Sequence, residues 1–216
     1  IDSSVVAVLT KKAFPDNSLA LILPCHSADD DLRHAKLVAE AIGMKYEVLN
    51  LSSVYDEMLD KLKIDKKETL VNANIKPRLR MTALYCYAAI NNYLVVGTGN
   101  KSEILTGYFT KYGDGGVDLE PLGGLYKHQV YKLAEHLKIP IEVITRPPSA
   151  GLWKDQTDEK ELGITYNDLD QYLQSGKGTK KTQELVDDLI KKSKHKRELP
   201  AIPDMEFSID CFKGND

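Results

Sequence analysis

The stretch 93–118 gathers residue types that could bind a phosphate group and a metal ion. It opens with a short apolar run, breaks at the Gly-Thr-Gly turn 97–99, and then resumes an apolar pattern typical of a helix. Such a turn brings backbone N–H groups to the carboxyl end of a strand, where open α/β sheets bind ligands. The glycines would let the backbone approach a ligand closely, while Thr98 offers a hydroxyl and Glu103 a carboxylate for a metal. The glycine-rich loop 111–118 that follows is of a type that handles a substrate.

A plainer interpretation of the same stretch is a strand, a turn and a solvated helix. A lone Gly-x-Gly pattern often serves only the turn. The variety of polar residue types in this stretch favours a ligand site.

Arg78 and Arg80 lie near the start of an expected helix that carries Met81, Leu84 and Ala88 on one face. Cations at a helix N-terminus oppose the helix dipole, so an anionic partner is a reasonable inference. Structural salt bridges explain the two arginines equally well from the pattern alone.

The elements that must position these residues alternate between strand and helix. The apolar run 19–24 predicts a buried parallel strand, and a helix is expected from Ala28 to about Gly43. A second strand is expected at 45–51, followed by a helix from Ser52 or Ser53. In that helix we expect an inward face made of Val54, Met58 and Leu62. The order predicts an α/β fold with a doubly wound parallel sheet flanked by helices.

Composition narrows the class of protein further. The chain has 216 residues, a net charge of -3 and a pI near 6.0, so one domain is the default and no basic field favours nucleic acid or a membrane as partner. Its three cysteines are far apart, which suggests neither a disulfide framework nor a zinc site. We therefore expect a reducing, cytoplasmic setting. No apolar run is long enough to span a bilayer, and no signal peptide opens the sequence.

Three consecutive motifs carry a family resemblance. GTGNKSE, then GYFTKYGDGGVD, then PLGGLYKHQVYKLA closely resemble the ammonia-dependent NAD synthetases, members of the ATP pyrophosphatase group with a Rossmann-like adenine-nucleotide hydrolase fold. The resemblance runs from Ile1 to about Pro200 and is strongest between Arg78 and Lys127. It implies that ATP activates the carboxylate of deamido-NAD as an acyl adenylate, releasing pyrophosphate. Ammonia then displaces AMP to give NAD, and no side-chain nucleophile is needed.

The resemblance also assigns residues to ATP and magnesium. The first three residues match the end of the family's Ser-Gly-Gly-x-Asp-Ser phosphate loop, so 1–216 is expected to be one domain that lacks its N-terminal strand and the start of this loop. The residues implied for ATP are Asp2, Ser3, Arg80, Thr98, Lys127 and Ser149, and those implied for Mg²⁺ are Asp2 and Glu103. Lys127 and Asp114 are the implied catalytic residues, with Asp114 orienting or deprotonating ammonium. A lysine at the first turn of a helix is otherwise usually a solvated charge.

A second set of residues is implied for the dinucleotide. They are Arg78, Lys111, Asp118, Glu161, Leu162, His195 and Lys196. The stretch 153–161 resembles the family's mobile loop over the active site, and Gly151 replaces an acidic residue that is usual there. The cluster 195–197 could equally be a helix C-terminus whose cations complement the dipole. Members of the family form homodimers, so a homodimer is expected.

Two other functions remain open. One is a different ATP pyrophosphatase, such as a GMP-synthetase-like amidating enzyme or a tRNA-thiolating enzyme, although the chain lacks the basic face and paired cysteines that a tRNA enzyme would need. The other is a non-catalytic nucleotide-binding module. No nitrilase-like domain is present in these residues, so free ammonia is the expected nitrogen donor.

Overall fold

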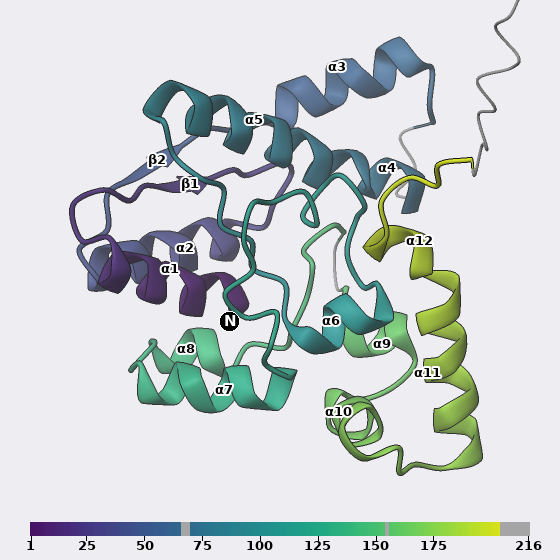
Figure 1. Ribbon diagram of the computed structural model, residues 1–216. Helices are drawn as coiled ribbons and strands as arrows, with labels where there is room; N and C mark the ends of the chain where they lie inside the picture. Colours follow the sequence, from purple (N-terminus) through teal and green to yellow (C-terminus); the bar gives the residue numbers. More distant parts are fainter. Residues whose placement is uncertain (66–69, 154–155, 204–216) are drawn as a thin grey trace, which may run out of the picture.

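A computed structural model describes residues 1–65, 70–153 and 156–203 (Figure 1). Its two strands are β1, Ala20–Ile22, and β2, Tyr46–Val48. The helices of the first half are α1 Asp2–Ala13, α2 Asp29–Ala41, α3 Ser52–Leu62, α4 Leu70–Ala73, α5 Ile75–Asn91 and α6 Lys101–Thr106. Those of the second half are α7 Lys127–His136, α8 Ile141–Ile144, α9 Asp158–Leu162, α10 Tyr166–Ser175, α11 Lys180–Lys192 and α12 Lys194–Arg197.

The two strands pair in parallel, with Ala20 opposite Tyr46 and Ile22 opposite Val48. Helix α2 connects them, because parallel neighbours need a crossover connection. Helices α1 and α2 lie on one side of the pair and α5 on the other (Figure 1). This arrangement confirms the predicted α/β class with a parallel sheet between helices.

The predicted strand at 93–96 is reduced to a single parallel bridge between Val96 and Leu119. Two hydrogen bonds flank the bridge: Gly97 N–H donates to Leu119 O across 2.8 Å, and Asp118 N–H donates to Val95 O across 2.9 Å. The glycine-rich loop is thus bound, at its end, to the apolar run that precedes the turn.

The inward face predicted for α3 is wrong. Val54, Met58 and Leu62 are 48%, 39% and 53% exposed, whereas Tyr55 and Leu59 are buried. The sequence offers two apolar stripes at the same i, i+4 spacing, displaced from each other by one residue, or about 100° around the helix. The stripe that packs is the one that faces Leu23, Cys25 and the other members of a core cluster beneath α3.

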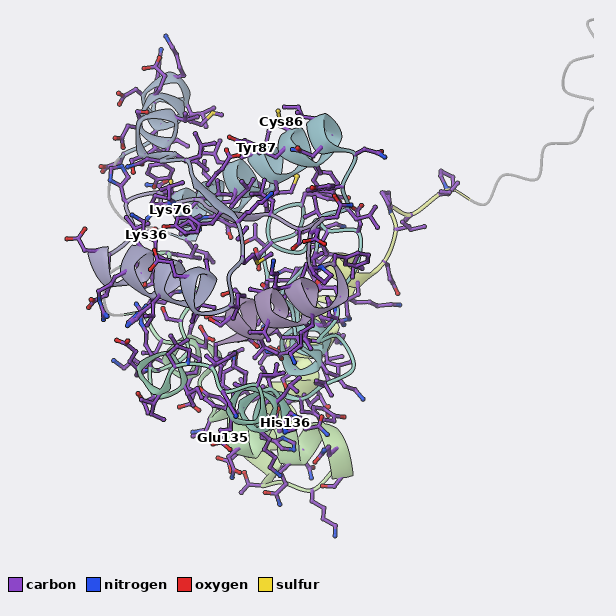
Figure 2. The ribbon with its side chains drawn as sticks, turned by 90° about the vertical axis from the view of Figure 1, so that its left-hand side faces the viewer. Lys36, Lys76, Cys86, Tyr87, Glu135 and His136 are labelled. Atoms are coloured by element: carbon purple, nitrogen blue, oxygen red, sulfur yellow. The ribbon has the colours of Figure 1, made fainter. Side chains whose placement is uncertain are left out.

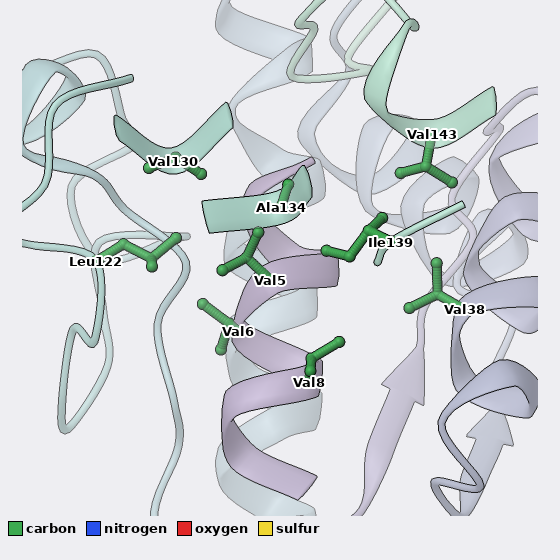
Figure 3. Close-up of a cluster of buried hydrophobic side chains, with 9 residues drawn as sticks. All are labelled: Val5, Val6, Val8, Val38, Leu122, Val130, Ala134, Ile139 and Val143. Atoms are coloured by element: carbon green, nitrogen blue, oxygen red, sulfur yellow. The ribbon is translucent and has the colours of Figure 1, made fainter. Parts of the chain in front are cut away.

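Helix α1 is held in place by a cluster of branched apolar side chains (Figure 3). Val5 of α1 and Val130 of α7 are completely buried in it, and Val38 of α2 and Val143 of α8 complete its edge. Burying a valine side chain stabilises a fold by about 1.5–3 kcal/mol. The packing therefore fixes the start of α1, where Asp2 lies, against the start of α7.

Lys76 of α5 is a buried cation that the sequence pattern did not single out. It lies in the body of the molecule, whereas Cys86 and Tyr87 lie at the outer edge of the same helix (Figure 2). Its Nζ donates to Leu152 O across 2.6 Å and lies 5.4 Å from the ring centroid of Tyr55. Lys76 thereby anchors the segment that precedes α9 to the central helix.

A third cluster joins the later helices. Leu162 of α9, Tyr166 and Leu169 of α10, and Val186 of α11 are buried together.

Among the described residues, no helix combines the length and the apolar character that a membrane span requires.

Candidate active site

Glu103 is positioned by a capping box at the start of α6. The Asn100 side-chain oxygen accepts the Glu103 N–H across 3.1 Å, and Glu103 Oε2 accepts the Asn100 N–H across 3.2 Å. This reciprocal pair satisfies two N–H groups that a helix start otherwise leaves unbonded. The Asn100 amide also donates to Asp2 Oδ1 across 2.8 Å. One buried asparagine therefore orients both carboxylates that the sequence assigned to magnesium.

Lys127, the first residue of α7, enters between these carboxylates. Its Nζ lies 2.5 Å from Asp2 Oδ2 and 3.0 Å from Glu103 Oε1, and its side chain is only 2% exposed. The Tyr166 ring centroid is 4.9 Å from the same nitrogen. A buried ammonium is very costly unless it is paired and hydrogen-bonded. Lys127 is therefore part of a buried ionic cluster and not a solvated surface charge.

The electrostatics of this cluster follow from burial and from the excess of carboxylates. Burial alone would lower the pKa of Lys127, but Glu103 and Asp2 outweigh it and raise the pKa. Burial and then the neighbouring Asp2 raise the pKa of Glu103 to about 7, against the influence of Lys127. For Asp2, burial favours a higher pKa, but Lys127 prevails and lowers it. One lysine thus faces two largely buried carboxylates and can neutralise only one negative charge, which favours a further cation beside them.

A fully buried carboxylate outside this cluster, Asp170 of α10, ties α6 to α7. It accepts hydrogen bonds from the Ser102 hydroxyl and from the His128 N–H, the latter across 2.9 Å, and His128 Nδ1 is 2.8 Å away. Ser102 in turn accepts the Lys127 N–H across 3.1 Å. These residues adjoin Glu103 and Lys127 in the chain, so Asp170 fixes both at once. No local sequence signal marks Asp170, because its partners come from other helices.

Four of the residues predicted for the dinucleotide lie around α12. Arg78 Nε donates to Lys111 O across 3.4 Å, and Lys111 Nζ donates to His195 O. Lys196 Nζ donates to the carbonyl oxygens of Gly107 and Phe109, each across 2.7 Å. A hollow of about 200 Å³ opens beside Lys196. Its lining is Thr106, Gly107, Tyr108, Leu162, Leu189, Lys192, Ser193 and Lys196.

The other residues predicted for the dinucleotide and for ammonia have clear partners. Asp118 accepts the Tyr85 hydroxyl across 3.0 Å and the Val95 N–H across 2.7 Å. Asp114 accepts the Thr110 N–H across 2.9 Å, and burial raises the pKa of its carboxyl group.

Leu162, also predicted for the dinucleotide, is 5% exposed and lines the hollow while packing in the cluster of α9 to α11. Glu161 beside it is exposed and accepts the Tyr108 hydroxyl and the Gln156 amide, each across 2.8 Å.

The remaining residues predicted for ATP lie outside the hydrogen-bonded Asp2–Lys127–Glu103 cluster. Arg80 Nε donates to Leu23 O across 2.9 Å, so its guanidinium is directed to the end of β1. Ser3 and Ser149 are exposed, and Thr98 is half-buried in the turn before α6. Within the described parts of the chain, no hydrogen bond joins these four residues to Asp2, Glu103 or Lys127.

The glycines of the turn 97–99 make room for Glu120, a residue that none of the sequence motifs marks. A Cβ on Gly97 would lie 2.8 Å from the Glu120 carboxyl carbon, and one on Gly99 would lie 3.0 Å from both carboxyl oxygens. Burial raises the pKa of Glu120 to about 7, while the Gly99 N–H opposes the shift. Its Oε2 is buried and has no hydrogen-bond partner among the described residues. The close approach that requires glycine here is therefore to a side chain of the same protein.

Comparison with known proteins decides the family. The NAD synthase family matches residues 1–200. The chain is 50% identical over 206 residues to the NH(3)-dependent NAD(+) synthetase of Carboxydothermus hydrogenoformans, covering 94% of this chain and 85% of that protein. This chain belongs to the NAD synthase family.

Solved structures of similar proteins support the same membership. The NMN synthetase of Francisella tularensis has a TM-score of 0.90 at 36% identity, and the alignment covers 94% of this chain and 85% of that one. The NH3-dependent NAD synthetase of Campylobacter jejuni has a TM-score of 0.75 at 30% identity, with the same coverage. The NAD synthases thus share with this chain the parallel α/β fold in which the Asp2–Lys127–Glu103 cluster is built.

Proposed function

We propose that this NAD synthase is a ligase that amidates deamido-NAD with ammonia, using ATP and forming NAD, AMP and pyrophosphate. The observation that carries the proposal is the buried Asp2–Lys127–Glu103 cluster in a chain half identical to an NH(3)-dependent NAD(+) synthetase. Such a cluster offers one fixed ammonium and two carboxylates, which are the groups that phosphoryl transfer requires.

The reaction has two steps. The nicotinate carboxylate of deamido-NAD attacks the α-phosphorus of ATP, and pyrophosphate leaves to give an acyl adenylate. Ammonia then attacks the acyl carbon, the bond to AMP breaks, and a proton is released. Lys127 stabilises the charge that develops on the phosphate oxygens, and Asp114 receives or orients the proton of the incoming nitrogen. Arg80, Thr98, Ser3 and Ser149 complete the ATP site in this proposal.

Magnesium would be held by Asp2 and Glu103. Both are hard oxygen donors, and Mg²⁺ in nucleotide enzymes commonly takes one or two carboxylates together with substrate phosphates and water. In the part of the chain that the structure describes, no group of three or more His, Cys, Asp or Glu side chains could hold a metal ion by itself. In this proposal, substrate phosphates and water supply the further oxygen ligands. When bound, the ion neutralises phosphate charge as pyrophosphate leaves.

The dinucleotide site is proposed around α9, α12 and the glycine-rich loop. Two observations support this position: the contacts of Arg78, Lys111 and His195 with one another, and the hollow beside Lys196. The residues proposed to contact deamido-NAD are Arg78, Lys111, Asp118, Glu161, Leu162, His195 and Lys196.

The proposal is tested by incubating the protein with ATP, Mg²⁺, ammonium and deamido-NAD, with NAD and AMP measured together. Equal amounts of both products are expected, and Lys127→Gln should abolish both. Lys132→Gln, on the exposed side of the same helix, is the matched control and should retain full activity. AMP formation with XMP but not with deamido-NAD would instead support a GMP-synthetase-like enzyme. ATP binding without any pyrophosphate release would support a non-catalytic module.

One structural observation supports testing a second acceptor, nicotinate mononucleotide. The TM-score of 0.90 to the Francisella tularensis NMN synthetase exceeds that of 0.75 to the Campylobacter jejuni NAD synthetase. Formation of NMN by the same chemistry would amidate nicotinate mononucleotide, which carries the same reactive carboxylate without the adenylyl half. The ratio of kcat/KM for the two acceptors decides between them, and we expect deamido-NAD to be preferred.

We further propose that residues 1–216 act as one domain within a cytoplasmic homodimer. The family resemblance supports the dimer. Cys25 and Cys86, the two cysteines among the described residues, are both free. Light scattering of the purified protein measures the oligomeric state directly.

A further inference from the structure

A continuous chain of carboxyl and phenol groups joins the ATP site to α9. Tyr166 Oη lies 3.3 Å from Glu103 Oε1 and 3.1 Å from Asp158 Oδ2. Tyr108 Oη lies 3.1 Å from Asp158 Oδ1 and 2.8 Å from Glu161 Oε2. The order is therefore Glu103, Tyr166, Asp158, Tyr108, Glu161.

The middle of this hydrogen-bonded series is buried. Asp158 is 4% exposed and Tyr166 is 6% exposed. Asp158 has no salt-bridge partner in the described parts of the chain, and the two phenols are its side-chain donors. Burying a carboxylate that is supported only by hydroxyl groups costs free energy of folding. A role in positioning another group would explain why Asp158 lies there.

Each phenol has one proton and two carboxyl neighbours, so it can donate to only one of them at a time. When Tyr166 donates to Glu103, Asp158 depends on Tyr108, and Glu161 loses that donor. When Tyr166 donates to Asp158, Tyr108 is released to donate to Glu161. Two discrete arrangements of the same hydroxyl groups therefore exist.

We propose that Tyr166 and Asp158 are positioning residues that couple nucleotide binding at Glu103 to deamido-NAD binding at α9. A nucleotide with its cation engages Glu103 and turns the Tyr166 hydroxyl to Asp158. Tyr108 then donates to Glu161, which is thereby oriented beside Leu162 and the hollow. The inference rests on the proposed function, because it uses the two substrates assigned there.

Coupling of this kind is measured as a ratio of affinities. Calorimetric titration of the full chain with deamido-NAD, in the absence and presence of Mg²⁺ and a non-hydrolysable ATP analogue, gives this ratio. We expect the analogue to tighten deamido-NAD binding by a factor of about 5 or more. Tyr166→Phe keeps the ring over Lys127 but removes the hydroxyl, so the ratio should fall towards one.

Two further variants separate coupling from a loss of structure. Tyr108→Phe breaks the chain at its other phenol and should lower the ratio in the same way. Tyr172→Phe is the matched control, since this tyrosine lies on the same helix as Tyr166 and donates to the exposed Asp187 across 2.8 Å. It should leave the ratio unchanged, and all three variants should unfold cooperatively.

The outcomes distinguish this inference from the proposed function. A full ratio in Tyr166→Phe would overturn the coupling, as would a wild-type protein that binds both ligands independently. In both cases the proposed function would stand. A protein that binds neither deamido-NAD nor the ATP analogue would overturn both.

Discussion

Asn100 and Asp2 are joined by a hydrogen bond of 2.8 Å that links the start of α6 to the start of α1. Because Asn100 also caps the helix that carries Glu103, one side chain determines the separation of the two carboxylates proposed for magnesium. The site proposed for this NAD synthase therefore depends on a residue that does not itself carry charge.

Asn100→Asp separates the two roles of Asn100, which are to cap α6 and to donate a hydrogen bond to Asp2. Aspartate caps a helix as well as asparagine does, so the cap is retained. The donor to Asp2 is replaced by a carboxylate, which places a third negative charge in the cluster. We expect a rise in the KM for ATP of at least tenfold, measured by steady-state kinetics, with little change in helix content.

Asn100→Ala removes both roles and should destabilise the protein by about 1–2 kcal/mol in urea unfolding. Thr179→Ala is the matched control, because Thr179 caps α11 by accepting the Thr182 N–H. It should lose similar stability and no activity. Normal ATP kinetics in Asn100→Asp would show that Asp2 is oriented by something else.

Asp170→Asn should loosen the alignment of α6 with α7. Asparagine has the same size, but its amide cannot accept from both the Ser102 hydroxyl and His128 as the carboxylate does. We expect a loss of about 1–3 kcal/mol in stability and a lower kcat. Asp168→Asn, exposed on the same helix, serves as the control in denaturant unfolding and kinetic assays. Equal behaviour of the two variants would contradict a bridging role for Asp170.

Glu120→Gln should change how stability depends on pH. Burial raises the pKa of this carboxyl group from 4.5 to about 7. A carboxyl whose pKa is raised by folding contributes stability that is present below pH 4.5 and is lost as the pH rises towards 7. Glutamine does not titrate, so the Tm of the variant relative to wild type should improve by about 2–4 °C between pH 5 and pH 8. Glu135→Gln, at an exposed position, is the control. A difference in Tm between Glu120→Gln and the wild type that stays constant across that range would refute the burial argument.

Gly107→Ala should cost more stability than Gly176→Ala. Both glycines end helices in the left-handed region, with φ of 68° and 67°, where a side chain costs about 1–2 kcal/mol. A Cβ on Gly107 would also lie 2.1 Å from Ser193 Cβ, whereas one on Gly176 would have nothing within 4 Å. Thermal unfolding of the pair isolates the contact between α6 and α11. Equal losses would mean that this contact can be relieved without cost.

The local part of the fold follows from sequence because its signals are contiguous. The apolar run at β1, the helix α2 and the strand β2 each have their own pattern, and all three were predicted. The face of α3 was not, since two apolar stripes one residue apart have the same periodicity and only the neighbouring core selects between Leu59 and Met58. Local pattern thus predicts the element but leaves its orientation open.

The candidate site likewise contains residues that could be predicted from sequence motifs and residues that could not. Asp2, Glu103 and Lys127 were predicted from motifs that the family shares, and the structure brings them into direct contact. Tyr166 and Asp170 were not predicted, because each acts on a residue more than sixty positions away and neither belongs to a recognisable motif. Such partners are defined by packing between helices, which a single sequence does not reveal.

The central claim is that deamido-NAD is activated as an acyl adenylate at the Asp2–Lys127–Glu103 cluster. Deamido-NAD labelled with ¹⁸O in both carboxylate oxygens tests it directly when the AMP released during NAD synthesis is analysed by mass spectrometry. Attack of the carboxylate on the α-phosphorus leaves one labelled oxygen in AMP and one in the carboxamide of NAD. We predict one ¹⁸O in each AMP formed, and unlabelled AMP alongside NAD would contradict the account.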